Sequence, residues 1–185
     1  MSKLFVISGS SGVGKGTVIN GFMKRNPEFK LSVSCTTRHP RDGEIDGVNY
    51  FFLTEEEFLE GVKNGEFLEY AEFAQHHYGT KRAFVDKCLE NGVNLILEID
   101  TTGALNVKEK MPDAVLIFIA PPSLEILEKR LRNRHTEDEE TIKKRLSAVK
   151  LELERAEKYD YKVINDELEN AIISLENIIK KEILK

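Results

Sequence analysis

One stretch decides the fold of this chain: Gly9-Ser10-Ser11-Gly12-Val13-Gly14-Lys15-Gly16-Thr17. It follows a short apolar run, residues 4–7, and leads into residues 18–24, which can form a helix. Glycines let successive backbone N–H groups point into one concavity, and the N-terminus of a helix adds partial positive charge. A strand, a glycine-rich turn ending in Gly-Lys and a helix therefore predict a phosphate-binding loop, in which Lys15 reaches the β- and γ-phosphates of a nucleotide.

The loop departs from the strict pattern at one position. That pattern has Ser or Thr directly after the lysine, whereas this chain has Gly16 there and Thr17 one residue later. An ordinary Gly/Ser turn between a strand and a helix is the alternative interpretation. The position of the loop directly after the first strand favours phosphate binding.

The composition is that of a soluble globular protein: 185 residues, of which 41% are hydrophobic and 32% charged. This length predicts one domain, with room for an inserted lobe. No stretch approaches the ~18 apolar residues that span a membrane, and residues 1–3 run directly into the first strand, which leaves no room for a signal peptide. Cys35 and Cys88 fit no metal or redox spacing and are predicted to be reduced, buried thiols. We therefore expect a cytoplasmic protein.

The distribution of charge points to small ligands. The net charge is −5, which argues against broad binding to a nucleic-acid backbone. Arg38 and Arg41 nevertheless lie close together, and basic residues also crowd residues 129–145. Local arginine clusters in an acidic protein indicate small anionic ligands rather than a polymer.

The apolar pattern predicts an α/β fold. Strands are expected at residues 3–8, 93–99, 114–120 and 161–164, and the second and third of these are continuous apolar runs, typical of strands buried on both faces of a parallel sheet. Helices are expected between them. They lie at residues 18–24, 81–90, 103–110, from 121 onwards, 139–157 and at the C-terminal end. Strands that alternate with helices predict a parallel sheet wound by helices.

Residues ~32–80 interrupt this pattern with strand-rich sequence. Residues 31–34 alternate as a half-exposed strand does, residues 48–53, 67–73 and 78–80 are further strand-like runs, and Thr54 opens a short helix with a capping box. We expect an inserted lobe beside the carboxyl edge of the sheet, where ligands bind in such folds. The predicted core then comprises residues ~1–31, ~81–122 and ~147–185, and residues ~123–146 form a helical lid.

Asp100 follows the apolar strand at residues 93–99. A carboxylate there faces the phosphate loop across the sheet edge and could hold a magnesium ion directly or through water. The alternative is that Asp100 is the N-cap of the next helix.

The lobe carries a second set of polar side chains. They are Ser34, Arg38, Arg41, Glu44, Tyr50, Glu69, Tyr78 and Thr80. The two arginines could clamp a phosphate. Glu69 lies in an apolar run, and a buried carboxylate needs donors; guanine offers two N–H donors and an O6 acceptor, so Glu69 with the hydroxyl of Ser34 or Thr80 would select guanine. Glu69 could instead be the exposed residue of an alternating strand.

A third set consists of arginines after the strand at residues 114–120. Several arginines that close on a phosphoryl group in transfer stabilise its transition state, whereas exposed charges paired at i, i+4 are the alternative. Arg134, at the bend between two helices, and Arg145 are the predicted members.

With these residues, the chain closely resembles the bacterial guanylate kinases over essentially its whole length. The shared motifs include residues 11–17, 34–44, 47–52, 67–69, 78–80, 98–100, 134–137, 144–146 and 164–166, in order and at the spacing of the family. The resemblance implies a P-loop NTPase-type fold and an enzyme that converts GMP, and dGMP, to GDP or dGDP with ATP and Mg²⁺. A monomer and a homo-oligomer are both compatible with it. It also implies that lobe and lid close over both nucleotides and exclude water.

The resemblance assigns roles by position. ATP would be bound by Gly9, Ser10, Ser11, Gly12, Val13, Gly14, Lys15, Gly16, Thr17, Arg134 and Asn165, and GMP by Ser34, Arg38, Arg41, Glu44, Tyr50, Glu69, Tyr78, Thr80 and Asp100. Lys15, Arg38, Arg134 and Arg145 would neutralise the moving phosphoryl group. Thr17 and Asp100 are the candidate protein ligands of magnesium.

Four positions differ from the family pattern. Ser10 stands where many relatives have proline, and Gly16 replaces the serine that some relatives place on magnesium. Thr101 and Thr102 replace an aromatic or aliphatic residue and a glutamine, and His135 replaces a glycine after the lid arginine.

Overall fold

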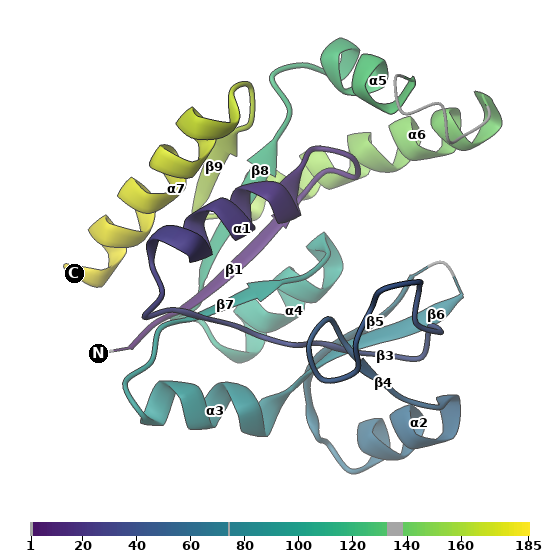
Figure 1. Cartoon of the computed structure of the whole chain (residues 1–185), viewed down its shortest axis with the longest axis vertical. Helices are drawn as coiled ribbons and strands as arrows, with labels where there is room; N and C mark the ends of the chain where they lie inside the picture. Colours follow the sequence, from purple (N-terminus) through teal and green to yellow (C-terminus); the bar gives the residue numbers. More distant parts are fainter. Residues whose placement is uncertain (1, 74, 133–138) are drawn as a thin grey trace.

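The computed structural model describes residues 2–73, 75–132 and 139–185, without the side chains of residues 73, 130–131 and 139–145 (Figure 1). The strands are β1 (Leu4–Gly9), β2 (Lys30–Leu31), β3 (Cys35–Thr36), β4 (Phe51–Phe52), β5 (Phe67–Phe73), β6 (His76–Lys81), β7 (Leu95–Glu98), β8 (Val115–Ala120) and β9 (Tyr161–Ile164). The helices are α1 (Lys15–Arg25), α2 (Glu55–Lys63), α3 (Arg82–Glu90), α4 (Thr101–Lys110), α5 (Leu124–Arg132), α6 (Glu139–Arg155), the short 3-10 helix η1 (Ala156–Lys158) and α7 (Leu168–Ile183).

Five strands form the core sheet in the order β2-β7-β1-β8-β9, and every neighbouring pair is parallel. The predicted parallel sheet wound by helices is therefore confirmed. The strand β1 lies at its centre, so the loop that follows β1 opens at the carboxyl edge between β7 and β8. This is the edge at which open α/β sheets bind their ligands.

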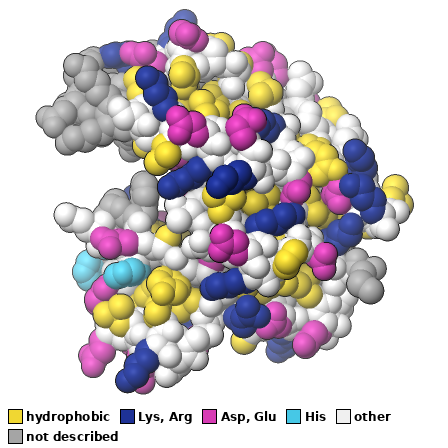
Figure 2. Space-filling model, turned by 180° about the vertical axis from the view of Figure 1, so that it is seen from behind, with side chains coloured by type: hydrophobic (Ala, Val, Ile, Leu, Met, Phe, Trp, Pro, Cys, Tyr) yellow, Lys and Arg dark blue, Asp and Glu magenta, His cyan; other side chains and the backbone are white. Residues whose placement is uncertain are grey.

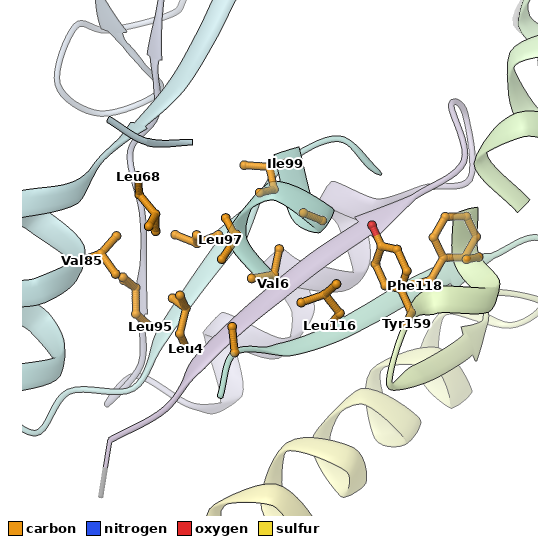
Figure 3. Packing of buried hydrophobic residues seen from close by; sticks show 14 of the residues in the cluster. Leu4, Val6, Leu68, Val85, Leu95, Leu97, Ile99, Leu116, Phe118 and Tyr159 are labelled. Carbon is orange, nitrogen blue, oxygen red and sulfur yellow. The ribbon is translucent and has the colours of Figure 1, made fainter. Parts of the chain in front are cut away.

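The sheet is covered on both faces because successive side chains of a strand point to opposite sides. Phe5 and Ile7 of β1 pack with α1 and α7 in one buried cluster, and Figure 1 shows these two helices on the same side of the sheet. Leu4 and Val6 of the same strand point the other way, into a cluster that extends across β7 and β8 to Tyr159 (Figure 3).

The lobe has its own four-stranded sheet, in the order β4-β3-β6-β5. The strands β5 and β6 form an antiparallel hairpin, and α2 packs Phe58 against Phe67 over Cys35. The capping box is confirmed, since the Thr54 hydroxyl accepts from the backbone of Glu57 while the Glu57 carboxylate accepts from the backbone of Thr54.

Two strand predictions in this part of the chain were wrong. Of the strand expected at residues 31–34, only Leu31 lies in a strand: β2 ends there in the core sheet, and β3 begins at Cys35 in the lobe sheet. The chain crosses from one sheet to the other at residues 32–34. The alternation of apolar and polar residues there does not correspond to a strand. The run at residues 48–53 contributes only β4, because a turn in which Gly47 N–H donates to Tyr50 O precedes it.

The helices α5 and α6 project together from the core in Figure 1. Leu127 and Val149 are fully buried between them, with Leu124, Leu146 and Leu153 around them. Of the predicted lid, residues 133–138 lie outside the described residues.

The two cysteines are free and buried, as predicted. Within the described ranges, no helix combines the length and the apolar character needed to cross a membrane.

Candidate active site

A cavity of about 440 Å³ opens where the core sheet meets the lobe. Seen from behind in Figure 2, the molecule is hollowed on the side between the lobe and the α5–α6 end. Side chains from three separate regions line the cavity. They include Ser11 and Lys15 from the phosphate loop, Ser34, Tyr50, Glu69 and Tyr78 from the lobe, and Glu98, Asp100 and Glu152 from the core.

The loop after β1 has the conformation that its glycines predict. Gly12 and Gly14 have φ angles of 82° and 88°, in the left-handed region that other residues avoid, and Gly14 is the N-cap of α1. Asn165 supports the loop from beneath: its side-chain N–H donates to Val13 O at 2.7 Å. The Asn165 side chain is buried under the loop. Its predicted contact with a nucleotide stays a prediction.

Lys15 lies at the mouth of this loop. Its ammonium group donates to Ile99 O at 3.3 Å and lies 3.8 Å from the Glu98 carboxylate. Both contacts are long for interactions of a charged amine, and the Lys15 side chain lines the cavity. This is the position from which a lysine can reach the phosphates of a nucleotide.

A carboxylate from α6 approaches the same loop. Glu152 Oε2 accepts the backbone N–H of Ser11 at 3.2 Å. Burial raises the pKa of Glu152, and the nearby charge of Lys15 opposes that shift. The loop thus has a backbone donor directed at an anionic group, which is the chemistry of phosphate binding.

Asp100 has the N-cap role that we considered as an alternative. Its Oδ1 accepts the backbone N–H groups of Thr102 at 2.7 Å and Gly103 at 3.1 Å. Asp100 also lines the cavity, so capping α4 and facing a ligand are compatible roles for this side chain.

Glu69 is the buried carboxylate of the site, only 3% exposed. The Thr80 hydroxyl donates to its Oε1 at 2.7 Å. Burial raises the pKa of the Glu69 carboxyl to about 7, and the charge of Asp100 adds to the shift. The alternative that Glu69 is an exposed strand residue is therefore wrong: Glu69 is buried, and it lies opposite Thr80 in the pairing of β5 with β6.

Four further side chains of the lobe form one cluster. The Arg38 guanidinium lies 2.9 Å from the Glu44 carboxylate and 5.5 Å from the centre of the Tyr50 ring. The rings of Tyr50 and Tyr78 meet edge to face, with centroids 6.0 Å apart. The hydrogen bond from Arg38 lowers the pKa of Glu44 and raises that of Arg38. Arg41 is joined to Glu44 through its backbone: its N–H donates to the Glu44 carboxylate at 2.8 Å, and its carbonyl accepts the Glu44 N–H at 3.0 Å.

The remaining predicted site residues differ in their exposure, and two of them are not fully described. Thr17 is exposed on α1 and Ser10 is buried. Arg134 lies outside the described residues, and so does the side chain of Arg145. Among the residues that are described, no group of three His, Cys, Asp or Glu side chains is arranged to hold a metal ion by itself.

The model of the guanylate kinase family matches residues 1–182 of the chain. The chain belongs to the guanylate kinase family. It is 46% identical to the guanylate kinase of Oceanobacillus iheyensis, over 98% of this chain and 88% of the relative. It is 50% identical to that of Caldanaerobacter subterraneus subsp. tengcongensis, over 97% of this chain and 87% of the relative.

A solved structure supports the same family assignment. The crystal structure of guanylate kinase from Anaplasma phagocytophilum superposes with a TM-score of 0.82 at 34% identity. The match covers 100% of this chain and 87% of the other. The fold of this family member is thus that of a solved guanylate kinase.

Two of the positions that depart from the family pattern now have a structural context. The Arg155 guanidinium donates to Thr101 Oγ1 at 3.2 Å and to Thr102 Oγ1 at 2.8 Å. Since Glu152 lies one turn earlier on the same helix, α6 contacts both the phosphate loop and the start of α4. The hydroxyls of the two threonines accept the hydrogen bonds through which α6 contacts the start of α4.

Glu98 and Glu152 also line the cavity, and neither was among the predicted site residues. Glu98 had a signal, since it interrupts the apolar run of β7 and lies two residues before Asp100, on the same side of an extended chain. Glu152 lies beside the apolar stripe of Val149 and Leu153, a weak signal that gives no partner. Its contact with Ser11 spans 141 residues.

Proposed function

We propose that this protein transfers the γ-phosphoryl group of ATP to GMP, and to dGMP, producing ADP and GDP or dGDP. One observation carries the proposal beyond family membership: a single cavity is lined by the phosphate-loop residue Lys15 and by the buried carboxylate of Glu69. The first group fits the phosphates of ATP, and the second fits the donor edge of guanine.

On the acceptor side, Glu69 would accept the two N–H donors of guanine. Thr80 already directs its one hydroxyl hydrogen to Glu69, so it cannot also donate to guanine O6. We therefore assign O6 to Ser34, which lines the cavity. Tyr50, Tyr78, Arg38 and Arg41 would surround the phosphate of GMP, and Glu44 would orient the Arg38 guanidinium.

In the reaction, an oxygen of the GMP phosphate forms a bond to the γ-phosphorus of ATP while the bond to the β–γ bridging oxygen breaks. No protein nucleophile is needed, because positioning and charge lower the barrier. Lys15 and Arg38 would stabilise the charge on the transferring group. We propose the same role for Arg134 and Arg145, together with a lid closure that excludes water.

The cofactor of this proposal is Mg²⁺, which neutralises charge on the β- and γ-phosphates when it is bound. The donor set fits this ion, because Mg²⁺ uses one or two carboxylates and completes its shell with phosphate and water oxygens. Glu98 and Asp100 line the cavity beside Lys15. A Cβ on Gly16 would lie 3.6 Å from Glu98 Oε1, so Glu98 faces the position where the strict loop pattern places a hydroxyl. We add Glu98 to Thr17 and Asp100 as a candidate ligand.

The test is a coupled ADP-release assay over a panel of acceptors: GMP, dGMP, AMP, CMP, UMP and ribose bisphosphate. We expect turnover with GMP and dGMP to exceed that with the other acceptors by at least about 10²-fold, since unpaired buried polar groups penalise the wrong base. A preference for another acceptor would identify a related kinase. Absence of ATP binding would favour a non-enzymatic module such as the guanylate-kinase-like domains of scaffold proteins.

The KM for GMP should depend on pH. Only the ionised form of Glu69 accepts both guanine donors, and its pKa in the free protein is about 7. Protonation below pH 7 therefore weakens GMP binding, and we expect the KM for GMP to rise about tenfold from pH 8 to pH 6. The ratio of KM values for wild type and the Glu69→Gln variant removes the titration of GMP itself, and a ratio independent of pH would contradict the assignment.

A further inference from the structure

We propose that Gly103 is a specificity-determining residue, because the space left by its missing side chain sets the position of the Glu69 carboxylate. A Cβ on Gly103 would lie 2.5 Å from Glu69 Oε2 and 3.2 Å from Glu69 Cδ. The first separation is shorter than Cβ contacts in proteins allow. This inference rests on the proposed role of Glu69 in reading guanine.

The carboxylate of Glu69 has little freedom to avoid an added methyl group. Its other oxygen accepts the hydroxyl hydrogen of Thr80 at 2.7 Å, and the side chain is buried. The backbone next to it is fixed as well: Leu68 packs into the core cluster beside Leu97 (Figure 3), and Lys110 Nζ donates to Leu68 O at 2.6 Å. A methyl group on Gly103 would therefore displace the carboxylate while β5 stays in place.

The helix that carries Gly103 is fixed from the other side. Asp100 caps α4 and accepts the backbone N–H of Gly103 at 3.1 Å. Ala104 of α4 is fully buried in the core cluster, which holds the helix against the core sheet. Ile99 Cδ1 would lie 3.5 Å from the added Cβ, at ordinary van der Waals contact. The first turn of α4 thus serves two functions: Asp100 faces the cavity, and Gly103 forms the surface against which Glu69 Oε2 rests.

The test is Gly103→Ala, assayed with ATP and GMP varied in turn. We expect the KM for GMP to rise at least about tenfold, the cost of losing one hydrogen bond to a charged group, and the KM for ATP to change less than twofold. Equal effects on both substrates, or no effect on the KM for GMP, would overturn the proposal. Alanine favours helix over glycine, so the folded state is expected to persist.

Glu69→Asp provides the second variant, because its carboxylate is one methylene shorter and retreats from the added methyl. In the Gly103→Ala, Glu69→Asp double variant, the effect of Gly103→Ala on the KM for GMP should largely disappear. Independent, multiplicative effects would contradict a contact between the two residues. If Gly103→Ala alone unfolds, the double variant should recover folding, and failure to do so would also count against the contact.

Gly21→Ala is the matched control, since the added Cβ in α1 would lie 2.3 Å from Ile172 Cδ1, an apolar side chain far from Glu69 in the fold. It should lower thermal stability without a selective change in the KM for GMP. The proposed function is tested separately by Glu69→Gln. If that variant leaves the KM for GMP unchanged, the guanine role of Glu69 fails; if it raises the KM but Gly103→Ala does not, only the role of Gly103 fails.

Discussion

Lys15→Met should reduce phosphoryl transfer at least about 10³-fold, because the variant loses a fixed positive charge where negative charge develops in the transition state. The folded state should be nearly unaffected. Lys15 makes one hydrogen bond at 3.3 Å and one ion pair at 3.8 Å, and partly exposed pairs of this kind contribute less than about 1 kcal/mol to the free energy of unfolding. The measurements are the coupled assay and a thermal melt followed by circular dichroism.

Lys24→Met is the control for this experiment, since Lys24 is an exposed lysine in the last turn of the same helix, α1. It should retain full activity. An active Lys15→Met enzyme would refute the assignment of the phosphate loop. A loss of activity accompanied by a large drop in the melting temperature would show that Lys15 also stabilises the fold, and it would contradict a role confined to the reaction.

Glu69→Gln should raise the KM for GMP about 10²-fold and leave the KM for ATP within twofold. The amide keeps the size of the carboxylate and can still accept from Thr80. It cannot accept both guanine donors, however, and its N–H₂ group would face one of them. Two hydrogen bonds to a charged group are lost, at about 1.5 kcal/mol or more each, and every 1.4 kcal/mol is a factor of ten.

The matched control is Glu72→Gln, which makes the same change on the exposed side of β5. Its KM values should equal those of the wild type. Equal increases in the KM for GMP and for ATP in Glu69→Gln would show that the variant disturbs the whole cavity rather than the recognition of the base.

Much of the fold was predictable because its signals are local. The phosphate loop, the capping box at Thr54 and the buried runs of β7 and β8 each depend on residues adjacent in sequence. Their patterns can therefore be recognised without knowing which segments pack against them. The strand β2 has only two residues, and β3 follows after a crossing between sheets. No periodic pattern exists over so few residues, and the prediction therefore placed one strand at residues 31–34, most of which form the crossing between β2 and β3.

The candidate site could be predicted as a set of residues but not as a set of contacts. The sequence left two hydroxyls, those of Ser34 and Thr80, as partners for guanine. The pairing of β5 with β6 places Thr80 opposite Glu69, and the Thr80 hydroxyl donates to the carboxylate. This is why we propose Ser34 as the partner of guanine O6. Likewise, Arg38 was predicted to clamp a phosphate together with Arg41, and only the structure shows that its guanidinium pairs with Glu44.

By itself, the sequence determined the class of fold, and it predicted the phosphate loop and a nucleotide site that includes Lys15 and Glu69. These follow from side-chain chemistry and from spacing over a few residues. Only the tertiary structure decided the raised pKa of Glu69, the contact of Glu152 with Ser11 and the space that Gly103 leaves. Burial and close approach arise between segments far apart in the chain, and they exist only once the core sheet, the lobe and α4 have packed together.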